Sequence, residues 1–351
     1  MAEKNGIGFV GSVVVDVVSE VLEPGNVVYS DGWRYLTGDD CESEKIEYST
    51  GGMVLNNSFN LADMGASYPI RVFGKIGCDE NAQRIRAALA AHGLTDASLT
   101  AVPDHPTSVT NVLYIRDSSG AVNRTFRHYF GAMGDFGLSD ITYEALEGLK
   151  IAMLGYSLLM PLFDREDSEY GAVVGRALEK IRAMGIITCL DFVTPKREKW
   201  WKFKRFRKTL RHVDILSIGE DQAEGITGLA DEKRAARSLV EEYGVKTAVV
   251  HCGDRGKNYL YSASTGLIEQ PIFRVPREEY AGNTGAGDAF TSGFLHGIHQ
   301  GWEEKKSLKY ATAAAAISLG SLTATGAMRR EEYILDYMET RPVLLNLKSE
   351  G

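Results

Sequence analysis

The sequence lacks the features that would place it at once among nucleic-acid-binding, membrane or secreted proteins. Basic residues are not in excess, because 39 Lys and Arg stand against 47 Asp and Glu, a formal net charge of −8. This balance excludes a general electrostatic attraction to nucleic acid or to an anionic membrane surface. No apolar run reaches membrane-spanning length and no signal-peptide pattern is present. We therefore expect a cytoplasmic protein with no membrane partner.

Cysteine is scarce, and the common phosphate-binding loops are missing or weakly matched. The four cysteines form no C-x-x-C pair, which excludes the usual zinc and dithiol motifs and fits a reducing compartment. No G-x-x-x-x-G-K-[ST] sequence occurs, so a P-loop is excluded. GIGFVG at 6–11 matches the dinucleotide fingerprint, but only five residues precede Gly6 and that fingerprint must follow a strand. An apolar first strand is the favoured interpretation.

One segment departs from the acidic balance. Residues 195–212, PKREKWWKFKRFRKTLRH, contain nine Lys and Arg and could form a surface for nucleic acid or polyphosphate. However, Trp200, Phe203, Phe206 and Leu210 recur at steps of three and four. This spacing places the apolar residues on one helical face and the cations on the other, so we favour a solvated surface helix and expect no nucleic-acid partner.

The chain does contain a clear alternation of apolar, β-rich runs with amphipathic segments of helix length. This alternation predicts an α/β fold with a doubly wound, mostly parallel sheet and helices on both faces. The length of 351 residues is enough for one large domain of this kind with an appendage. Core strands are expected at 6–14, 70–77, 150–157, 186–193, 214–218 and 246–253.

Two segments interrupt the alternation. Residues 15–50 and 106–131 are rich in β-branched and aromatic residues and contain the turn signals EPGN and DSSG. We expect them to form a small β-sheet lid that covers a pocket. Since no internal repeat or low-complexity linker is present, the expected α/β core consists of residues 1–14, 51–105 and 132–351.

The stretch NTGAGDAFTSGF, residues 283–294, predicts a glycine turn that leads into a helix. Its small residues allow a close backbone approach to an anion, and the free N–H groups of a helix N-terminus attract negative charge. Asp288 follows directly. A carboxylate there could take a proton from a nucleophile aimed at phosphorus, or it could simply cap the helix. The local pattern leaves both interpretations open.

Several ordered stretches together resemble the ribokinase-like (PfkB-type) family of carbohydrate and nucleoside kinases. NTGAGDAF resembles its C-terminal signature, and STGGMVLNNSFNLADMGA resembles its N-terminal signature. FGKIGCDENA resembles the family's glycine-aspartate turn, and VVHCGDRGKNYL its nucleotide-side strand and turn. The resemblance covers nearly the whole chain, which makes it far more specific than any single motif.

The resemblance implies an ATP-dependent phosphotransferase with two adjoining sites. By position, the catalytic group is Asp288, and the anion hole is formed by the amides of Gly285, Ala286 and Gly287. The acceptor, a sugar or sugar-like polyol, would bind under the lid at Asp16, Gly51, Gly52 and Asn56. ATP would bind near Gly253, Gly256 and Thr312, the last at a position near the adenine.

The sequence departs from the family pattern where magnesium is usually organised. The N-x-x-E pattern of the family is replaced here by Gly219 and Gln222. Glu220, Asp221 or Glu224 could substitute, but each is equally an acid favoured by the dipole at a helix N-terminus. Mg²⁺ is therefore expected to be held mostly through water and nucleotide oxygens.

A second departure concerns the monovalent cation of the potassium-activated family members. The aspartate that usually stands six residues before the base is Gly282 in this chain. We therefore predict weak or absent activation by potassium.

Two alternatives to a sugar kinase remain open at this point. A nucleoside kinase could use the same base and stack a nucleobase on Tyr29, Trp33 or Tyr35. The altered Gly219 and Gln222 positions also allow a sugar-binding regulator that has lost turnover. In each case, pairing of exposed lid edges between subunits would allow a homodimer.

Overall fold

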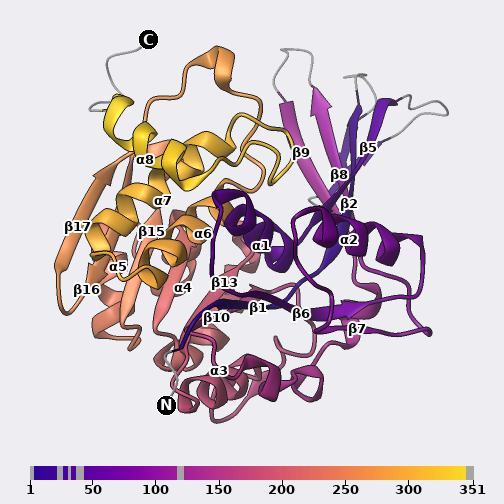
Figure 1. Cartoon of the computed structure of the whole chain (residues 1–351), viewed down its shortest axis with the longest axis horizontal. Helices are drawn as coiled ribbons and strands as arrows, with labels where there is room; N and C mark the ends of the chain where they lie inside the picture. Colours follow the sequence, from indigo (N-terminus) through magenta and orange to yellow (C-terminus); the bar gives the residue numbers. More distant parts are fainter. Residues whose placement is uncertain (1–3, 22–26, 31–32, 37–42, 117–121, 345–351) are drawn as a thin grey trace.

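The computed structural model describes residues 4–21, 27–30, 33–36, 43–116 and 122–344. Its main element is a nine-stranded sheet with the order β17-β16-β15-β14-β13-β10-β1-β6-β7 (Figure 1). Seven strands pair in parallel: β1 (Ile7–Gly11), β6 (Ile70–Ile76), β7 (Leu99–Ala101), β10 (Ile151–Ser157), β13 (Ile187–Phe192), β14 (Ile215–Gly219) and β15 (Thr247–His251). Two antiparallel strands complete one edge: β16 (Lys257–Ser262) and β17 (Gly266–Pro271).

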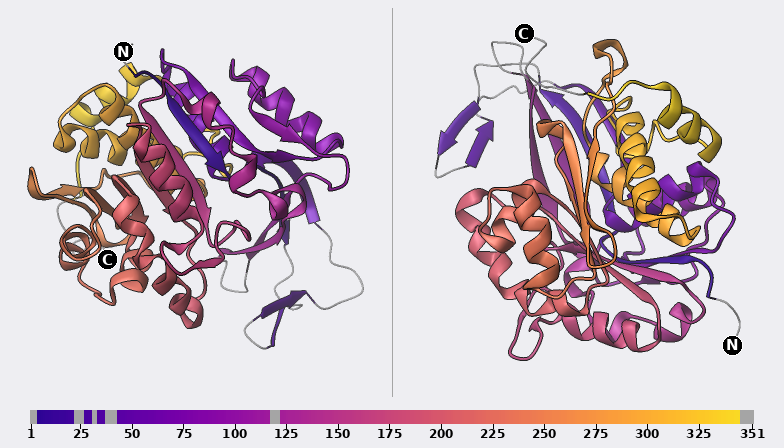
Figure 2. Two further views of the ribbon diagram at one scale, coloured as in Figure 1. Left: turned by 90° about the horizontal axis from the view of Figure 1, so that it is seen from below. Right: turned by 90° about the vertical axis from the view of Figure 1, so that its left-hand side faces the viewer.

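Helices cover both faces of this sheet, which confirms the predicted doubly wound α/β class. On one face lie α1 (Met53–Met64), α6 (Ala286–His299) and α7 (Glu304–Ser318), and on the other α3 (Val174–Ala183), α4 (Glu220–Thr227) and α5 (Glu232–Glu241) (Figure 2). The remaining α-helices of the described ranges are α2 (Glu80–Ala91) and α8 (Glu331–Thr340). None of the helices in these ranges combines the length and apolar character needed to cross a membrane.

The contact between α6 and α7 explains the small residues in both helices. Gly293 and Gly297 of α6 have no room for a side chain, because a Cβ there would lie 3.0 Å from Ala311 and 2.5 Å from Ser307. Phe290 and Phe294 are buried on the same helix. The structure thus confirms close packing of the Ala-rich helix against the glycine-bearing face.

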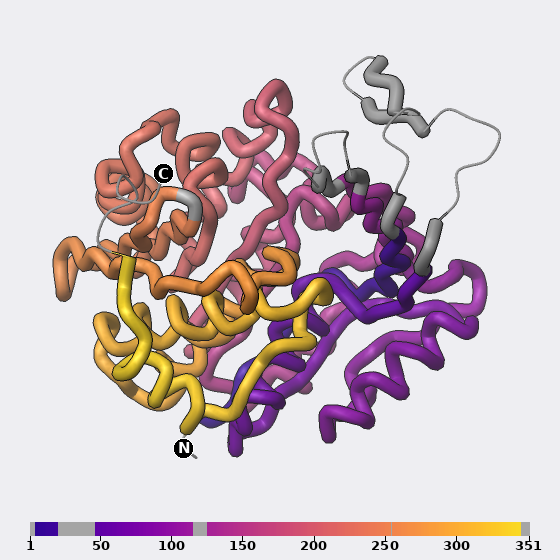
Figure 3. Tube along the Cα trace, turned by 90° about the horizontal axis from the view of Figure 1, so that it is seen from above, coloured from indigo at the N-terminus to yellow at the C-terminus, as the bar shows by residue number. Residues whose placement is uncertain are grey.

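In the Cα trace, the indigo N-terminal part and the yellow C-terminal part lie side by side (Figure 3).

A smaller, four-stranded sheet stands beside the core with the order β5-β2-β8-β9 (Figure 1). It consists of β2 (Val14–Val21), β5 (Ser43–Gly51), β8 (Val109–Arg116) and β9 (Val122–Tyr129). Strand β2 pairs antiparallel with β5 and parallel with β8, so two segments far apart in sequence share one sheet. A separate hairpin contains β3 (Val27–Ser30) and β4 (Trp33–Leu36). The predicted EPGN and DSSG turns lie outside the described residues.

The prediction of one core strand over residues 6–14 is wrong. Strand β1 ends at Gly11, and β2 begins at Val14 in the smaller sheet. Gly11 has φ +136°, and a Cβ there would lie 1.9 Å from the Gly155 carbonyl oxygen. The backbone must therefore turn at this glycine, and the apolar run, continuous in sequence, is divided between two sheets.

The basic segment packs as its apolar spacing predicts, although the helix is of the 3₁₀ type over Arg197–Arg207. Phe203 and Phe206 are completely buried. Arg205 and Arg207 donate to the backbone carbonyls of Asp164 and Ile226, each over 2.6 Å. These two cations thus stabilise the turn at Asp164 and the last turn of α4.

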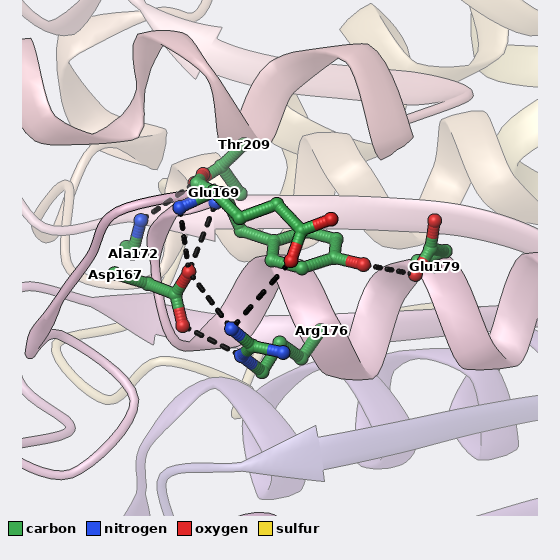
Figure 4. A network of polar contacts seen from close by, with 7 residues as sticks. Asp167, Glu169, Ala172, Arg176, Glu179 and Thr209 are labelled. Atoms are coloured by element: carbon green, nitrogen blue, oxygen red, sulfur yellow. Dashed lines mark hydrogen bonds and ion pairs between the residues drawn. The ribbon is translucent and has the colours of Figure 1, made fainter.

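A polar network fixes the short hairpin of β11 (Glu166–Asp167) and β12 (Gly171–Ala172) to α3 (Figure 4). The Asp167 carboxylate accepts hydrogen bonds from the backbone N–H groups of Glu169 and Tyr170, both at 3.0 Å. It also forms an ion pair with Arg176, 2.6 Å from Nε. The Tyr170 hydroxyl donates to Glu179 on the same helix, so local contacts account for each charged group of this network.

Candidate active site

The carboxylate of Asp288 lies in the first turn of α6, at the carboxyl ends of the parallel strands. Gly285 caps the helix with φ +78°, and a Cβ there would lie 2.6 Å from Ala324. Only glycine fits this turn without strain. A Cβ at Gly287 would lie 3.5 Å from His251, the last residue of β15. The N-terminus of α6 therefore occupies the edge where α/β sheets bind their ligands.

Three neutral donors from two other elements hold the Asp288 carboxylate. The Tyr156 hydroxyl, at the end of β10, lies 2.7 Å from Oδ1 and 2.8 Å from Oδ2. On α1, the Asn56 amide donates to Oδ2 over 2.9 Å and the Asn57 amide to Oδ1 over 3.2 Å. Asn57 is itself fixed by Met53, whose carbonyl accepts its second hydrogen bond at 2.9 Å. The side chain is thus oriented from outside its own helix.

Burial and hydrogen bonding act in opposite directions on Asp288. The residue is 7% exposed, and this burial raises the pKa of its carboxyl group above the usual range. Hydrogen bonds from Tyr156, Asn56 and Asn57 lower the pKa because they stabilise the ionised form. The three donors thus favour the ionised form of a carboxyl group whose burial favours the protonated form.

Asp16 lies close to the Asp288 carboxylate, in the first strand of the smaller sheet. It is the third residue of β2, inside the strand. Burial and, secondarily, the charge of Asp288 raise the pKa of Asp16 to about 7. A Cβ at Gly51, on the paired strand β5, would lie 2.1 Å from Asp16 Oδ2. The glycine leaves the space that the Asp16 side chain occupies.

Gly52 caps α1 with φ +86°, and a Cβ there would lie 2.5 Å from the Ser12 carbonyl oxygen. This turn brings Asn56 to the Asp288 carboxylate. The structure therefore brings together the predicted acceptor residues and the predicted base, although they are more than two hundred residues apart in sequence.

Three polar residues at this edge were missed by sequence reasoning: Tyr156, Asn57 and Asp191. Asp191 is buried near the end of β13, and its Oδ1 accepts a hydrogen bond of 2.6 Å from the Phe192 N–H. Burial and the charge of Asp288 raise its pKa well above the usual range. A usable signal existed, since Tyr156 and Asp191 are polar residues at the carboxyl ends of apolar strands.

The predicted nucleotide-side residues lie around the turn that follows β15. Gly253 begins a short 3₁₀ turn and faces open space, since nothing lies within 4 Å of a Cβ placed there. Gly256 ends the turn with φ +80°. Thr312 is 2% exposed and accepts a hydrogen bond of 3.0 Å from Asn258. Asn258 in turn accepts from the Cys252 N–H over 2.9 Å, so Thr312 supports the turn from behind.

Gly219 and Gln222, which replace the family's magnesium pattern, form hydrogen bonds within the protein. The Gln222 amide oxygen accepts from the Gly219 N–H over 2.9 Å, and its NH₂ group donates to the Phe192 carbonyl over 2.7 Å. Glu224 pairs with Arg197 at 2.7 Å. Glu220 lies in the first turn of α4. Within the described ranges, no group of three or more His, Cys, Asp or Glu residues could hold a metal ion.

Gly282 is likewise held by a backbone hydrogen bond. Its N–H and that of Ala281 both donate to the Leu319 carbonyl, over 3.2 and 2.8 Å. The carbonyl oxygen is therefore occupied by protein donors at the place where the family aspartate is missing.

Comparison with known proteins confirms the family resemblance found in the sequence. A family model described as pfkB family carbohydrate kinase matches residues 9–330. The chain belongs to the PfkB family of carbohydrate kinases. As a PfkB kinase, it is an enzyme of an ATP-using family.

Individual relatives within the PfkB family are distant. A ribokinase of Arabidopsis thaliana is 24% identical over 307 residues, which are 85% of this chain and 76% of the relative. A 5-dehydro-2-deoxygluconokinase of Geobacillus thermodenitrificans is 23% identical over 309 residues, 84% and 86% of the two chains. The solved structure of A. thaliana ribokinase complexed with ribose and ATP has a TM-score of 0.74 and 21% identity, covering 96% of this chain and 99% of that one. These similarities establish the ribokinase-like fold.

Proposed function

We propose that the protein transfers the γ-phosphoryl group of ATP to a hydroxyl of a small sugar or sugar-like polyol. The observation that carries this proposal is the buried Asp288 carboxylate, which lies at a helix N-terminus and is held by donors from other elements. Such a carboxylate is oriented for proton transfer, and its helix supplies N–H groups for an anion.

In the proposed step, the acceptor oxygen attacks the γ-phosphorus of ATP. Its proton passes to Asp288, the bond from the γ-phosphorus to the bridging oxygen breaks, and ADP leaves with that electron pair. Charge spreads over the transferred phosphoryl oxygens during the reaction. The N–H groups of Gly285, Ala286 and Gly287 stabilise this charge, together with the positive end of the α6 dipole.

The acceptor binds between the smaller sheet and α1, at Asp16, Gly51, Gly52 and Asn56. The carboxylate of Asp16 can accept hydrogen bonds from two neighbouring hydroxyl groups, which suits a polyol. The A. thaliana ribokinase structure is complexed with ribose and ATP, which supports a sugar as the class of acceptor.

An uncharged acceptor is favoured over an anionic one. Asp16, Asp191 and Asp288 converge on this space, and the charge of Asp288 raises the pKa of the other two carboxyl groups. An acceptor with a carboxylate or phosphate would add a further negative charge to the same region. The Geobacillus relative is named for a gluconate derivative, which is an anion. We therefore expect the specificity of this chain to differ from that of this relative.

ATP binds on the side of Gly253, Gly256 and Thr312, and Mg²⁺ neutralises part of its phosphate charge when bound. The residues available to the metal fit a weakly held, largely hydrated ion. Gln222 is occupied by backbone partners, Glu220 and Asp221 lie in the first turn of α4, and Glu224 pairs with Arg197. Binding mostly through water and phosphate oxygens is common for Mg²⁺.

The smaller sheet acts as a lid over the acceptor. The Tyr114 hydroxyl of β8 lies 2.7 Å from the Thr284 hydroxyl, next to the proposed anion hole. A closed lid excludes water, which would otherwise compete with the acceptor. On its outer face, Ile46, Tyr48 and Tyr129 are exposed. These side chains support a homodimer formed through the lid.

The function is tested by ADP release from Mg-ATP with acceptors matched in shape but not in charge. Suitable pairs are ribose with ribonate, fructose with fructose 6-phosphate, and glucitol with gluconate, with nucleosides as a separate group. We expect release with a neutral sugar or polyol. Release only with nucleosides would establish the nucleoside kinase, preference for the anionic partner would contradict the charge argument, and binding without turnover would indicate a regulator.

A further inference from the structure

Tyr156 reaches Asp288 because the pairing of its strand is irregular. Strands β10 and β13 are in regular parallel register up to Leu154 opposite Leu190, and pairing resumes at Ser157 opposite Phe192. Tyr156 lies within this interruption, half-buried, with its hydroxyl between the two oxygens of Asp288. The same interruption faces Asp191, whose Cβ lies 3.3 Å from a Cβ placed at Gly155.

Four polar contacts surround the Asp288 carboxylate, but they come from three donors. A carboxylate offers about four lone-pair sites. Asn56 and Asn57 use one site each, and Tyr156 contacts both oxygens. However, a hydroxyl has one proton and can donate strongly to only one oxygen at a time. Tyr156 can therefore give up its contact with one oxygen of Asp288 and keep its hydrogen bond to the other.

The other groups around Asp288 act on its ionisation in different directions: Asn56 and Asn57 favour it, as Tyr156 does, and two carboxyl groups oppose it. The carboxyl groups of Asp16 on β2 and Asp191 on β13 are like-charged neighbours. Asn56 and Asn57 on α1 are neutral donors. On β15, burial lowers the pKa of His251 to about 4, so this imidazole is neutral at physiological pH.

Tyr156 itself remains a donor. Its pKa is raised well above the usual value, first by burial and then by the charges of Asp288 and Asp191. The phenol thus keeps its proton across the physiological range and continues to stabilise the ionised carboxylate.

We propose that Tyr156 is a positioning residue that keeps Asp288 unprotonated and, by retreating to one carboxylate oxygen, leaves the other for the acceptor hydroxyl. This role deepens the proposed phosphotransferase function and rests on it. The acceptor then replaces one half of a shared hydrogen bond, and the base stays oriented throughout the exchange.

The decisive measurement is the titration of Asp288 itself. In protein labelled with ¹³C at aspartate carboxyls, the Asp288 resonance is assigned by its loss in D288N. We expect Y156F to raise the pKa of Asp288 by about one unit, because a hydrogen bond to the ionised form has been removed. The matched control is Y261F, which removes a hydroxyl that donates to Glu241 at the edge of the core sheet. This control should leave the Asp288 titration unchanged.

The same variant has a kinetic signature. The acid limb of kcat for Y156F should move to higher pH by the same amount, so its rate falls up to about tenfold below that of the wild type on the acid limb and recovers towards it at higher pH. An equal fall at every pH, or an Asp288 pKa that is unchanged or lower in Y156F, overturns the proposal.

A second substitution covers the case in which Y156F does not fold. Incorporation of 3-fluorotyrosine at position 156 preserves the ring and strengthens the donor, so the pKa of Asp288 should fall; an increase overturns the proposal. Because the titration needs no turnover, it remains decisive if the wild type releases no acceptor-dependent ADP. The absence of acceptor-dependent ADP release would refute the proposed function separately.

Discussion

Helices α4 and α6 place different side chains at the same position and use them in opposite ways. Each begins after a glycine cap at the carboxyl edge of the sheet, and the third residue is Gln222 in α4 and Asp288 in α6. Gln222 turns back to the N–H of its own cap, Gly219. Asp288 instead receives its hydrogen bonds from α1 and β10. One helix start is thus closed by its own side chain, whereas no side chain caps the start of α6.

This difference bears on the two roles that the sequence allowed for Asp288, because it argues against helix capping. Capping would require hydrogen bonds within the first turn of α6, as Gln222 makes in α4. The contacts of Asp288 with Tyr156, Asn56 and Asn57 support the role of base.

The largest expected effect comes from removing the charge at the α6 position. D288N should reduce kcat on the order of 10²- to 10⁴-fold and leave acceptor binding nearly unchanged, as expected for the loss of a general base. Steady-state ADP release and acceptor titration measure the two quantities. D96N, which removes a carboxylate paired with Arg86 on the surface, is the control. Near-normal turnover of D288N would show that another group accepts the proton.

The two glycine caps should respond differently to the same substitution. Gly285 has φ +78° and a Cβ there would lie 2.6 Å from Ala324, whereas Gly219 has φ −76° and its nearest neighbour would lie 3.4 Å away. We expect G285A to lower the free energy of unfolding by at least about 1–3 kcal/mol. G219A should change it far less. Urea denaturation of both variants tests this, and equal losses would contradict the geometry.

Restoring the usual family residue at the α4 position should be unfavourable. Q222E keeps an acceptor for the Gly219 N–H but loses the donor to the buried Phe192 carbonyl. The expected cost is about 1–3 kcal/mol in the free energy of unfolding. E224Q, which breaks only the pair with the exposed Arg197, should cost less than about 1 kcal/mol. If Q222E is as stable as the wild type and needs less Mg²⁺, the start of α4 is a metal site and the prediction is wrong.

The smallest effect is expected from monovalent cations. The Leu319 carbonyl is occupied by two N–H groups beside Gly282. Replacing sodium or choline by potassium at constant ionic strength should therefore leave the rate unchanged. A clear potassium activation in the ADP-release assay would refute this prediction.

The fold was largely predictable because the predicted core strands are rich in apolar residues and the connecting helices are amphipathic. The prediction failed at Gly11, where one apolar run is divided between two sheets. The turn is evident only in the structure, because a Cβ placed at Gly11 would clash with Gly155. The β16–β17 edge was not predicted either, because its hairpin interrupts the helix–strand alternation on which the assignment rested.

The candidate site was predictable where a local pattern carries the chemistry, as in the glycine turn before Asp288. The roles of Asn57 and Tyr156 depend on contacts across more than a hundred residues. No periodicity encodes such contacts. The side chains of Tyr29, Trp33 and Tyr35, on which the nucleoside alternative rested, lie outside the described part of the chain.

The division of one apolar run between two sheets at Gly11 has a mechanical consequence. Only Ser12 and Val13 separate the last residue of β1, in the core, from the first residue of β2, in the lid. In the lid motion that we propose, Asp16 moves with the smaller sheet, whereas Asp288 stays with the core. Opening of this lid would increase the distance between the two carboxylates and lower their mutual repulsion. Closing over an acceptor must then work against that repulsion, so an acceptor that bridges both carboxylates with its hydroxyl groups stabilises the closed lid.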